Sequence, residues 1–179
     1  MQEYTNLVKT YPIVMAMIQF AILGTFGEVI SRWMIEKKIF LPFKINTIIL
    51  KMLEWAILAI CIKYAFAGFH GFIETLINNG MLPKLNLFFK AFAISVATNL
   101  QFGLFLVIFH RILDNMVMRE KNWKNIDKGL YSLLWFWIPA HTITFMLPKL
   151  YQIGLAALWS VALGIILGFY NSKEKTIND

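Results

Sequence analysis

Four long segments that are almost free of charge constrain this chain more than any other feature of its sequence. Residues 10–27, 91–109, 129–148 and 150–172 contain no Asp, Glu, Lys or Arg, and His141 is their one histidine. About 20 apolar residues in a helix cross the ~30 Å hydrocarbon core of a bilayer. Each segment approaches or reaches that length, so the sequence predicts an integral membrane protein built from helices.

The composition excludes several other classes of protein. Hydrophobic residues make up 59% of the 179 residues and charged residues 15%, whereas a soluble domain has roughly 45–50% and about 25%. Cys61 is the single cysteine, which leaves no internal disulfide and no cysteine metal site. The net charge of +7 does not come from a basic run with interleaved aromatic residues, so we expect no nucleic-acid partner.

The order of apolar and polar segments predicts one all-α domain over residues 1–179, a polytopic helical membrane bundle. We expect about five spanning helices, over residues 12–35, 46–68, 85–114, 130–147 and 152–170. Residues 69–79 carry apolar side chains at spacings of three and four, which predicts a separate helix lying in the membrane interface. Pro139 interrupts the fourth span, and a re-entrant segment is the alternative there.

The distribution of Lys and Arg predicts the orientation of the bundle. With five spans, one side of the membrane receives four of these residues and the other side eleven. Because basic loops stay in the cytoplasm, we expect the N-terminus outside and the C-terminus in the cytoplasm. The chain opens on Gln2 and Glu3 rather than on a basic signal or an Arg-rich presequence, so a prokaryotic plasma membrane is the simplest location.

Three short patterns follow one another along the chain. The first consists of Tyr11-Pro12, Leu23, Gly27-Glu28 and Ile30-Ser31. The second consists of Gly103, Leu113 and Asp114, and the third of Trp137, Pro139, Thr144-Phe145, Pro148 and Gln152. In order and spacing, these patterns resemble those of the Mpv-seventeen and peroxisomal-membrane-protein family. The resemblance identifies a divergent, bacterial type of member.

The chain departs from the family patterns at several positions. Glu28 stands where the family has Asp, and Gln152 where it has Arg. The Pro, His, Trp and Tyr of the second family pattern are replaced by Leu104, Val107, Phe109 and His110. The resemblance implies a compact helical membrane protein that forms a pore for small solutes and has no established catalytic activity.

Six ionisable side chains on three predicted helices are expected at one depth near the cytoplasmic face. At ~1.5 Å per residue, Glu28 lies about 26 Å along the first helix, and Lys51 and Glu54 lie about 9 and 14 Å inside the second. The six are Glu28, Arg32, Lys51, Glu54, His110 and Asp114. Glu28 and Arg32 are four residues apart, the favoured spacing for a pair. The six residues either line a charged vestibule or form buried ion pairs that fix the helices.

Uncharged polar side chains are expected nearer the midplane of the bilayer. They are Gln19, Asn99, Gln101, His141, Thr142 and Thr144. Such groups either line a solute path or form hydrogen bonds between helices.

The leading interpretation is a pore or channel for small solutes. The alternatives are a substrate-binding membrane subunit of a vitamin uptake transporter, which would need an ATPase and a coupling partner, and a structural membrane protein. No Ser or Cys nucleophile stands in a motif beside a base, so we expect no enzymatic activity and no catalytic residues. We also expect no cofactor and no metal. The expected partners are the lipid bilayer, an unidentified small solute and, as an open alternative, further copies of the chain.

Overall fold

The structure is a computed structural model that describes residues 2–178, with side chains described through residue 172. Every regular element in this part of the chain is helical. The elements are α1 (Gln2–Thr10), α2 (Pro12–Glu36), α3 (Ile45–Asn78), α4 (Leu87–Ala97), η1 (Thr98–Gly103), α5 (Leu104–Met118), α6 (Ile126–Ser132), η2 (Leu133–Trp137), α7 (Ile138–Met146) and α8 (Lys149–Asn178). The π-helical segments η1 and η2 continue α4 and α6 without a break.

Four of the described helical stretches are long and apolar enough to cross a membrane. They are Pro12–Glu36, Ile45–Asn78, Leu87–Met118 and Lys149–Ser172. At most 33% of the most apolar window of each is buried inside the bundle, so the outer faces are apolar too. On α2, for example, Ile18, Ile22 and Phe26 are exposed. A helix that is apolar on its outer face needs lipid around it, so the chain is a helical membrane protein.

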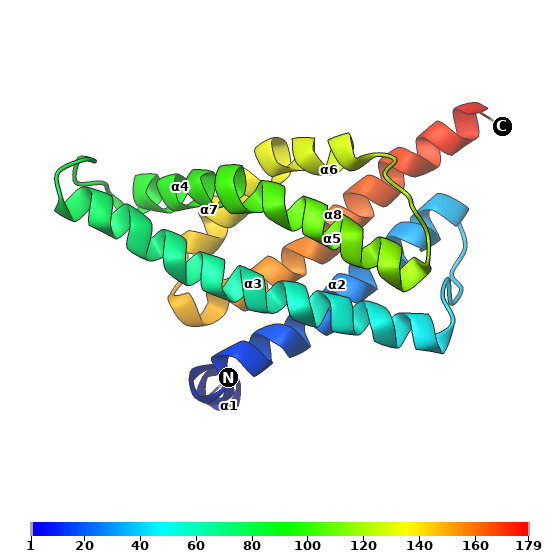
Figure 1. The fold of residues 1–179 in the computed structure, drawn as a ribbon, viewed down its shortest axis with the longest axis horizontal. Helices are drawn as coiled ribbons and strands as arrows, with labels where there is room; N and C mark the ends of the chain where they lie inside the picture. The colour runs from blue at the N-terminus through cyan, green and yellow to red at the C-terminus, as the bar shows by residue number, and fades with distance from the viewer. Residues whose placement is uncertain (1, 179) are drawn as a thin grey trace.

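The long helices run roughly along the longest axis of the molecule (Figure 1). α2 and α8 run side by side in one direction, and α3 returns the chain in the other. Glycines permit the close approach of α2 and α8, because a Cβ atom added to Gly164 would lie 2.3 Å from the Gly27 carbonyl oxygen. Close approach at small residues is a common way for membrane helices to pack.

The predicted end of the second helix at residue 68 is wrong. α3 continues through Gly68 to Asn78, so residues 69–78 are part of a long helix and do not form a separate interfacial one. A glycine inside a helix costs only about 1 kcal/mol, and Phe66 and Ile73, on either side of Gly68, are both buried in the core. Tertiary packing therefore holds α3 together. Residues 2–10, which precede the first predicted helix, form α1.

The predicted fourth span is a bent stretch of helix. Residues 126–146 change direction between α6 and α7 (Figure 1), where η2 is followed by Pro139 as the second residue of α7. This stretch is not among the candidate spans. The described part of the chain thus provides four candidate spans where the sequence predicts about five.

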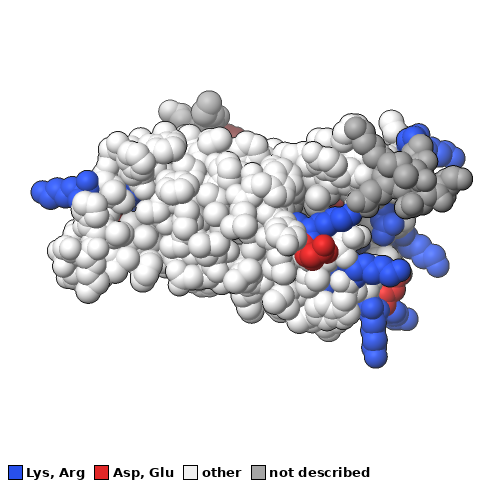
Figure 2. Space-filling model, turned by 90° about the horizontal axis from the view of Figure 1, so that it is seen from above, with Lys and Arg blue, Asp and Glu red and all other residues white. Residues whose placement is uncertain are grey.

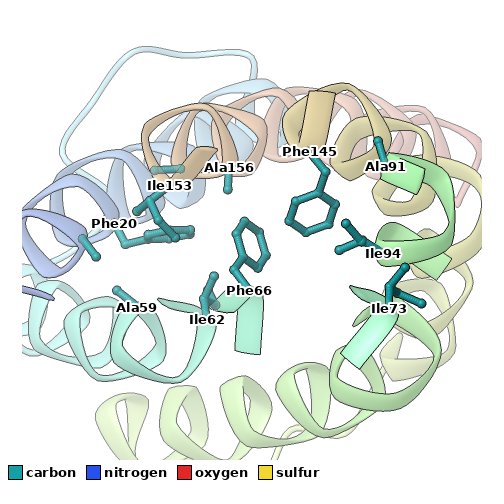
Figure 3. Close-up of a cluster of buried hydrophobic side chains, with 12 residues drawn as sticks. Phe20, Ala59, Ile62, Phe66, Ile73, Ala91, Ile94, Phe145, Ile153 and Ala156 are labelled. Atoms are coloured by element: carbon teal, nitrogen blue, oxygen red, sulfur yellow. The ribbon is translucent and has the colours of Figure 1, made fainter. Parts of the chain in front are cut away.

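The hydrophobic core lies in one half of the bundle. It joins α2, the middle and end of α3, the start of α4, the end of α7 and the start of α8 through residues such as Phe20, Ile73, Ala91, Phe145 and Ile153. At its centre the rings of Phe66 and Phe145 pack edge to face, with their centroids 4.7 Å apart (Figure 3). This half of the bundle is therefore closed by packed apolar side chains.

Lysine and arginine gather at the other end of the molecule. Figure 2 shows several blue side chains at one end and an uncharged surface along the middle. The basic end carries residues 37–44, between α2 and α3, and residues 119–125, between α5 and α6. The side chains of Lys173 and Lys175, which also enter the predicted charge asymmetry, lie outside the described residues.

Candidate functional site

Lys51 joins three helices in the basic half of the bundle. From α3, its Nζ donates hydrogen bonds to Oε2 of Glu28 on α2 and, at 2.7 Å, to Oδ1 of Asp114 on α5. Only 2% of Lys51 is exposed. A buried ammonium group needs such partners because desolvating it is costly. Lys51 therefore ties α2 and α5 to α3.

Trp55 holds the second oxygen of Glu28. Its indole Nε1 donates a hydrogen bond of 2.7 Å to Glu28 Oε1. The indole lies so close to α2 that a Cβ atom on Gly24 would be 2.3 Å from its ring. Gly24 thus makes room for Trp55, and Trp55 in turn fixes the orientation of the Glu28 carboxylate.

The predicted pair between Glu28 and Arg32 is wrong. Both oxygens of Glu28 accept hydrogen bonds from α3, whereas the exposed Arg32 has its guanidinium carbon 5.9 Å from the centroid of the Phe43 ring. A spacing of four residues puts two side chains on one side of a helix. The spacing does not reveal that Lys51, on the neighbouring helix α3, donates a hydrogen bond to the same carboxylate.

Glu54 and His110 form a second contact between α3 and α5. Nδ1 of His110 lies 2.8 Å from Oε1 of Glu54, whose side chain is 1% exposed. Among the described residues, none donates a well-directed hydrogen bond to either carboxylate oxygen of Glu54. The ring of His110 also packs edge-on against Trp55. Glu54 is therefore a deeply buried carboxylate that retains unused lone pairs.

The residues in the described part of the chain that could together hold a metal ion are Glu28, Glu54 and His110. One ligand atom from each lies within 4.8 Å of the other two. The set combines two carboxylates with an imidazole, and it draws one residue from each of α2, α3 and α5. Its position beside Lys51 makes it part of one charged cluster, defined here as Glu28, Lys51, Glu54, His110 and Asp114.

A cavity of about 400 Å³, called the vestibule here, lies between α2, α3, η1, α5, η2 and α8. Its lining begins at the basic end with the exposed loop residues Glu120 and Asn122 and passes four members of the charged cluster. It ends at Phe66 and His141, beside the hydrophobic core. The vestibule is therefore continuous from the basic end to the middle of the bundle and blind beyond it.

Both π-helical segments contribute to the wall of the vestibule. Thr98, Asn99 and Gly103 of η1 and Leu133 and Trp137 of η2 line it. A π-helical turn is rare in proteins and is frequent at functional sites. Its presence in two neighbouring helices beside one cavity marks this region as the candidate functional site.

Polar groups are concentrated at the inner end of the vestibule. Asn99 Nδ2 lies 3.2 Å from Nδ1 of His141 and donates a hydrogen bond of 2.8 Å to the carbonyl oxygen of Ser95. The hydroxyl of Ser95 donates to the carbonyl oxygen of Ile138, one residue before Pro139. These bonds link α4 and η1 to α7, so they both hold the helices and present polar atoms to the cavity.

The structure brings together most of the predicted site residues and separates the others. The predicted residues that line the vestibule are Glu28, Arg32, Lys51, Asn99, His110, Asp114 and His141. Glu54 does not line it and lies behind His110. Gln19 binds the Tyr4 hydroxyl of α1 instead, and Gln101 is exposed on the outer surface.

The two threonines expected near the midplane act in hydrogen bonds within the bundle. Thr142 donates to the carbonyl oxygen of Ile138, and Thr144 donates to that of Ala140. Trp159 of α8 donates to the Thr144 hydroxyl. The bonds that Thr142 and Thr144 donate stay within α7, so the expected hydrogen bond between helices is found only at Thr144, through Trp159.

Trp55 and Phe66 are functional candidates that the sequence analysis does not single out. Trp55 lies four residues after Lys51, a spacing that places both on one side of α3 and that could have indicated their association. The inward position of Phe66 has no comparable signal, because α3 is apolar on nearly every side.

Comparisons of the chain with family models, with curated proteins and with solved structures find no match.

Proposed function

We propose that this membrane protein conducts small polar or ionic solutes through the vestibule, as a divergent member of the Mpv-seventeen type. The observation that carries the proposal is the vestibule itself, which connects an exposed basic end to polar groups in the middle of an apolar bundle. Charged and polar groups at such a depth in an apolar bundle would be costly unless water or a solute reached them.

The proposed topology has five passes, with residues 126–146 as the fourth. α5 ends at the basic end of the molecule, whereas α8 begins at the other end (Figure 1). The chain must travel between the two ends over residues 119–148, and α6, η2 and α7 account for this return. The lower apolarity of this stretch fits a helix that lines a wet cavity with one of its sides. The proposed location is a prokaryotic plasma membrane with the basic end in the cytoplasm.

Phe66 is the proposed gate. Its ring lies at the inner end of the vestibule, where it packs against Phe145 and, edge-on, against His141 at a centroid distance of 5.2 Å. Apolar constrictions of this kind close a pore by excluding water. In this conformation, the path beyond Phe66 is blocked by the hydrophobic core.

Ion flux from liposomes that contain the purified chain tests this proposal. We expect a measurable flux, and we expect Phe66→Ala to increase it severalfold because the substitution removes the ring that blocks the path. Phe72→Ala is the matched control, since Phe72 is on the same helix and is 44% exposed. The proposal fails if no preparation conducts, or if Phe66→Ala and Phe72→Ala change the flux equally.

A substrate-binding membrane subunit is the second candidate function. The blind inner end favours it, and the volume of about 400 Å³ falls in the range of pockets for small organic molecules. A small molecule that co-purifies with the chain in equimolar amount, without any flux in liposomes, would favour this function over the pore.

A further inference from the structure

We propose that Glu28, Glu54 and His110 form a binding site for one divalent transition-metal ion, such as Zn²⁺ or Mn²⁺, beside the vestibule. The site is independent of conduction, because it depends on these side chains alone and not on a path through the membrane. From the sequence alone we expect no metal ion, so the site is an inference from the structure.

The separation of the three ligand groups suits a single ion. Their ligand atoms lie within 4.8 Å of one another, and ligand atoms around one tetrahedral Zn²⁺ lie about 3.3 Å apart at bond lengths of ~2.0–2.1 Å. Small rotations of the side chains therefore bring all three within bonding distance of a common centre. The backbones of α2, α3 and α5 need not move.

Glu54 is the strongest indication that something binds here. Its side chain is 1% exposed, and its Oε1 lies 2.8 Å from Nδ1 of His110. Its Oε2 has no hydrogen-bond partner among the described residues, and a buried carboxylate oxygen without a partner is costly. A cation between Glu54 and Glu28 would occupy the lone pairs that the protein leaves unused.

The charge of the surrounding groups leaves room for a cation. Glu28 and Asp114 pair with the ammonium group of Lys51, Glu54 lies against the imidazole of His110, and Arg111 is 3.8 Å from Asp114. Three carboxylates and two fixed positive charges leave one negative charge, which is offset either by a proton on His110 or by a bound metal ion. A net charge inside a membrane protein is unfavourable unless it is compensated in this way.

The ligand types select the class of metal. Carboxylate oxygens and an imidazole nitrogen suit Zn²⁺, Mn²⁺ and Fe²⁺, whereas Mg²⁺ and Ca²⁺ prefer oxygen ligands alone. Trp55 and Lys51 already donate hydrogen bonds to the Glu28 oxygens. Each carboxylate oxygen has two lone pairs, so these donors can orient Glu28 while it binds the ion. Such supporting contacts are typical of metal sites.

Equilibrium dialysis of the purified, untagged chain against Co²⁺, used as a spectroscopic substitute for Zn²⁺, tests the site. We expect one Co²⁺ per chain with visible absorption bands of an ion of low coordination number, and at least tenfold weaker binding for Glu54→Gln and for His110→Gln. The matched controls are Glu74→Gln and His70→Gln, which alter the same residue types on α3 outside the cluster. They should bind as the wild type does.

Chemical modification of histidines gives a second result that needs no variant. Zn²⁺ should protect His110 of the wild-type chain from diethyl pyrocarbonate and leave the modification of His70 unchanged, as read by mass spectrometry of peptides. The inference is overturned if the wild type binds much less than one equivalent of Co²⁺, if the site variants bind as the controls do, or if Zn²⁺ does not protect His110.

Discussion

Lys51 shows how a membrane protein can keep a charge in the interior of a helical bundle. Its ammonium group is nearly inaccessible, and its partners come from two other helices. In a medium of low dielectric constant, the attraction between such groups is strong, and so is the penalty when one of them is left alone. The charged cluster therefore stabilises the bundle as well as lining the vestibule.

Replacing Lys51 by Met should lower the thermal unfolding midpoint in detergent substantially. The substitution keeps the length of the side chain but leaves Glu28 and Asp114 without their shared cation, at a cost of about 3–5 kcal/mol. The matched control is Lys90→Met, because Lys90 and Glu74 form an exposed pair of a kind worth under ~1 kcal/mol. Equal shifts for the two variants would contradict the structural role of the cluster.

For the charged residues, the depth in the bundle could be predicted from the sequence, but the pairing could not. Counting residues along each helix places Glu28, Lys51, Glu54 and His110 in one layer, and the structure brings them into contact. Their pairing could not be predicted, because it depends on how the helices are rotated against each other. This is why Arg32, the neighbour in sequence, is the wrong partner for Glu28.

At the scale of the elements, the α2–α8 contact depends on glycine. The positions of Gly27 and Gly164 leave no room for a methyl group between the two backbones. By contrast, Gly71 lies inside the last third of α3, with nothing within 4 Å of where a Cβ atom would stand. The two kinds of glycine therefore respond differently to the same substitution.

Gly164→Ala should destabilise the protein by about 1–3 kcal/mol, because the new methyl group forces α2 and α8 apart. Gly71→Ala should leave the stability unchanged or raise it by up to about 1 kcal/mol, because alanine favours the helix. Thermal unfolding of both variants in the same detergent checks this. A loss of stability for Gly71→Ala as large as that for Gly164→Ala would contradict the packing described.

The helices were predictable from their apolar segments, but their interruptions were not. Gly68 lies in a plausible break, yet buried neighbours on both sides keep α3 continuous. Gly103 ends the π-helical segment Thr98–Gly103, and Pro139 follows the segment Leu133–Trp137, but neither residue type by itself predicts a π-helical turn. Both segments depend on contacts between helices, which a single sequence does not reveal.

For the whole molecule, the first question is which end faces the cytoplasm. The loops at residues 37–44 and 119–125 lie at the same basic end (Figures 1 and 2). A cysteine at Asn125, in a Cys61→Ser background, should react with an impermeant thiol reagent in inverted membrane vesicles and not in intact cells. Labelling of that cysteine in intact cells would place the basic end outside.

The vestibule is a property of the whole molecule. The polar and charged residues of its wall could be predicted from the sequence, but the cavity itself could not. Polar and charged residues at compatible depths indicate that a wet cavity is possible. Whether they line one cavity depends on the packing between helices, which turns Asn99 and His141 inward and Gln101 outward. Its blind end depends on the contact of Phe66 with Phe145, residues far apart in the chain.

Access of water to the vestibule from the basic end is the central claim, and cysteine accessibility on α8 tests it most directly. Leu163 lines the vestibule, whereas Ile165, two residues away, is 42% exposed on the outer surface. In a Cys61→Ser background, Leu163→Cys should react quickly with a charged thiol reagent applied to the basic side, because the reagent reaches it through water. Ile165→Cys should remain almost unreactive, because lipid covers it. An unreactive Leu163→Cys, or equal reactivity at both positions, would contradict the vestibule.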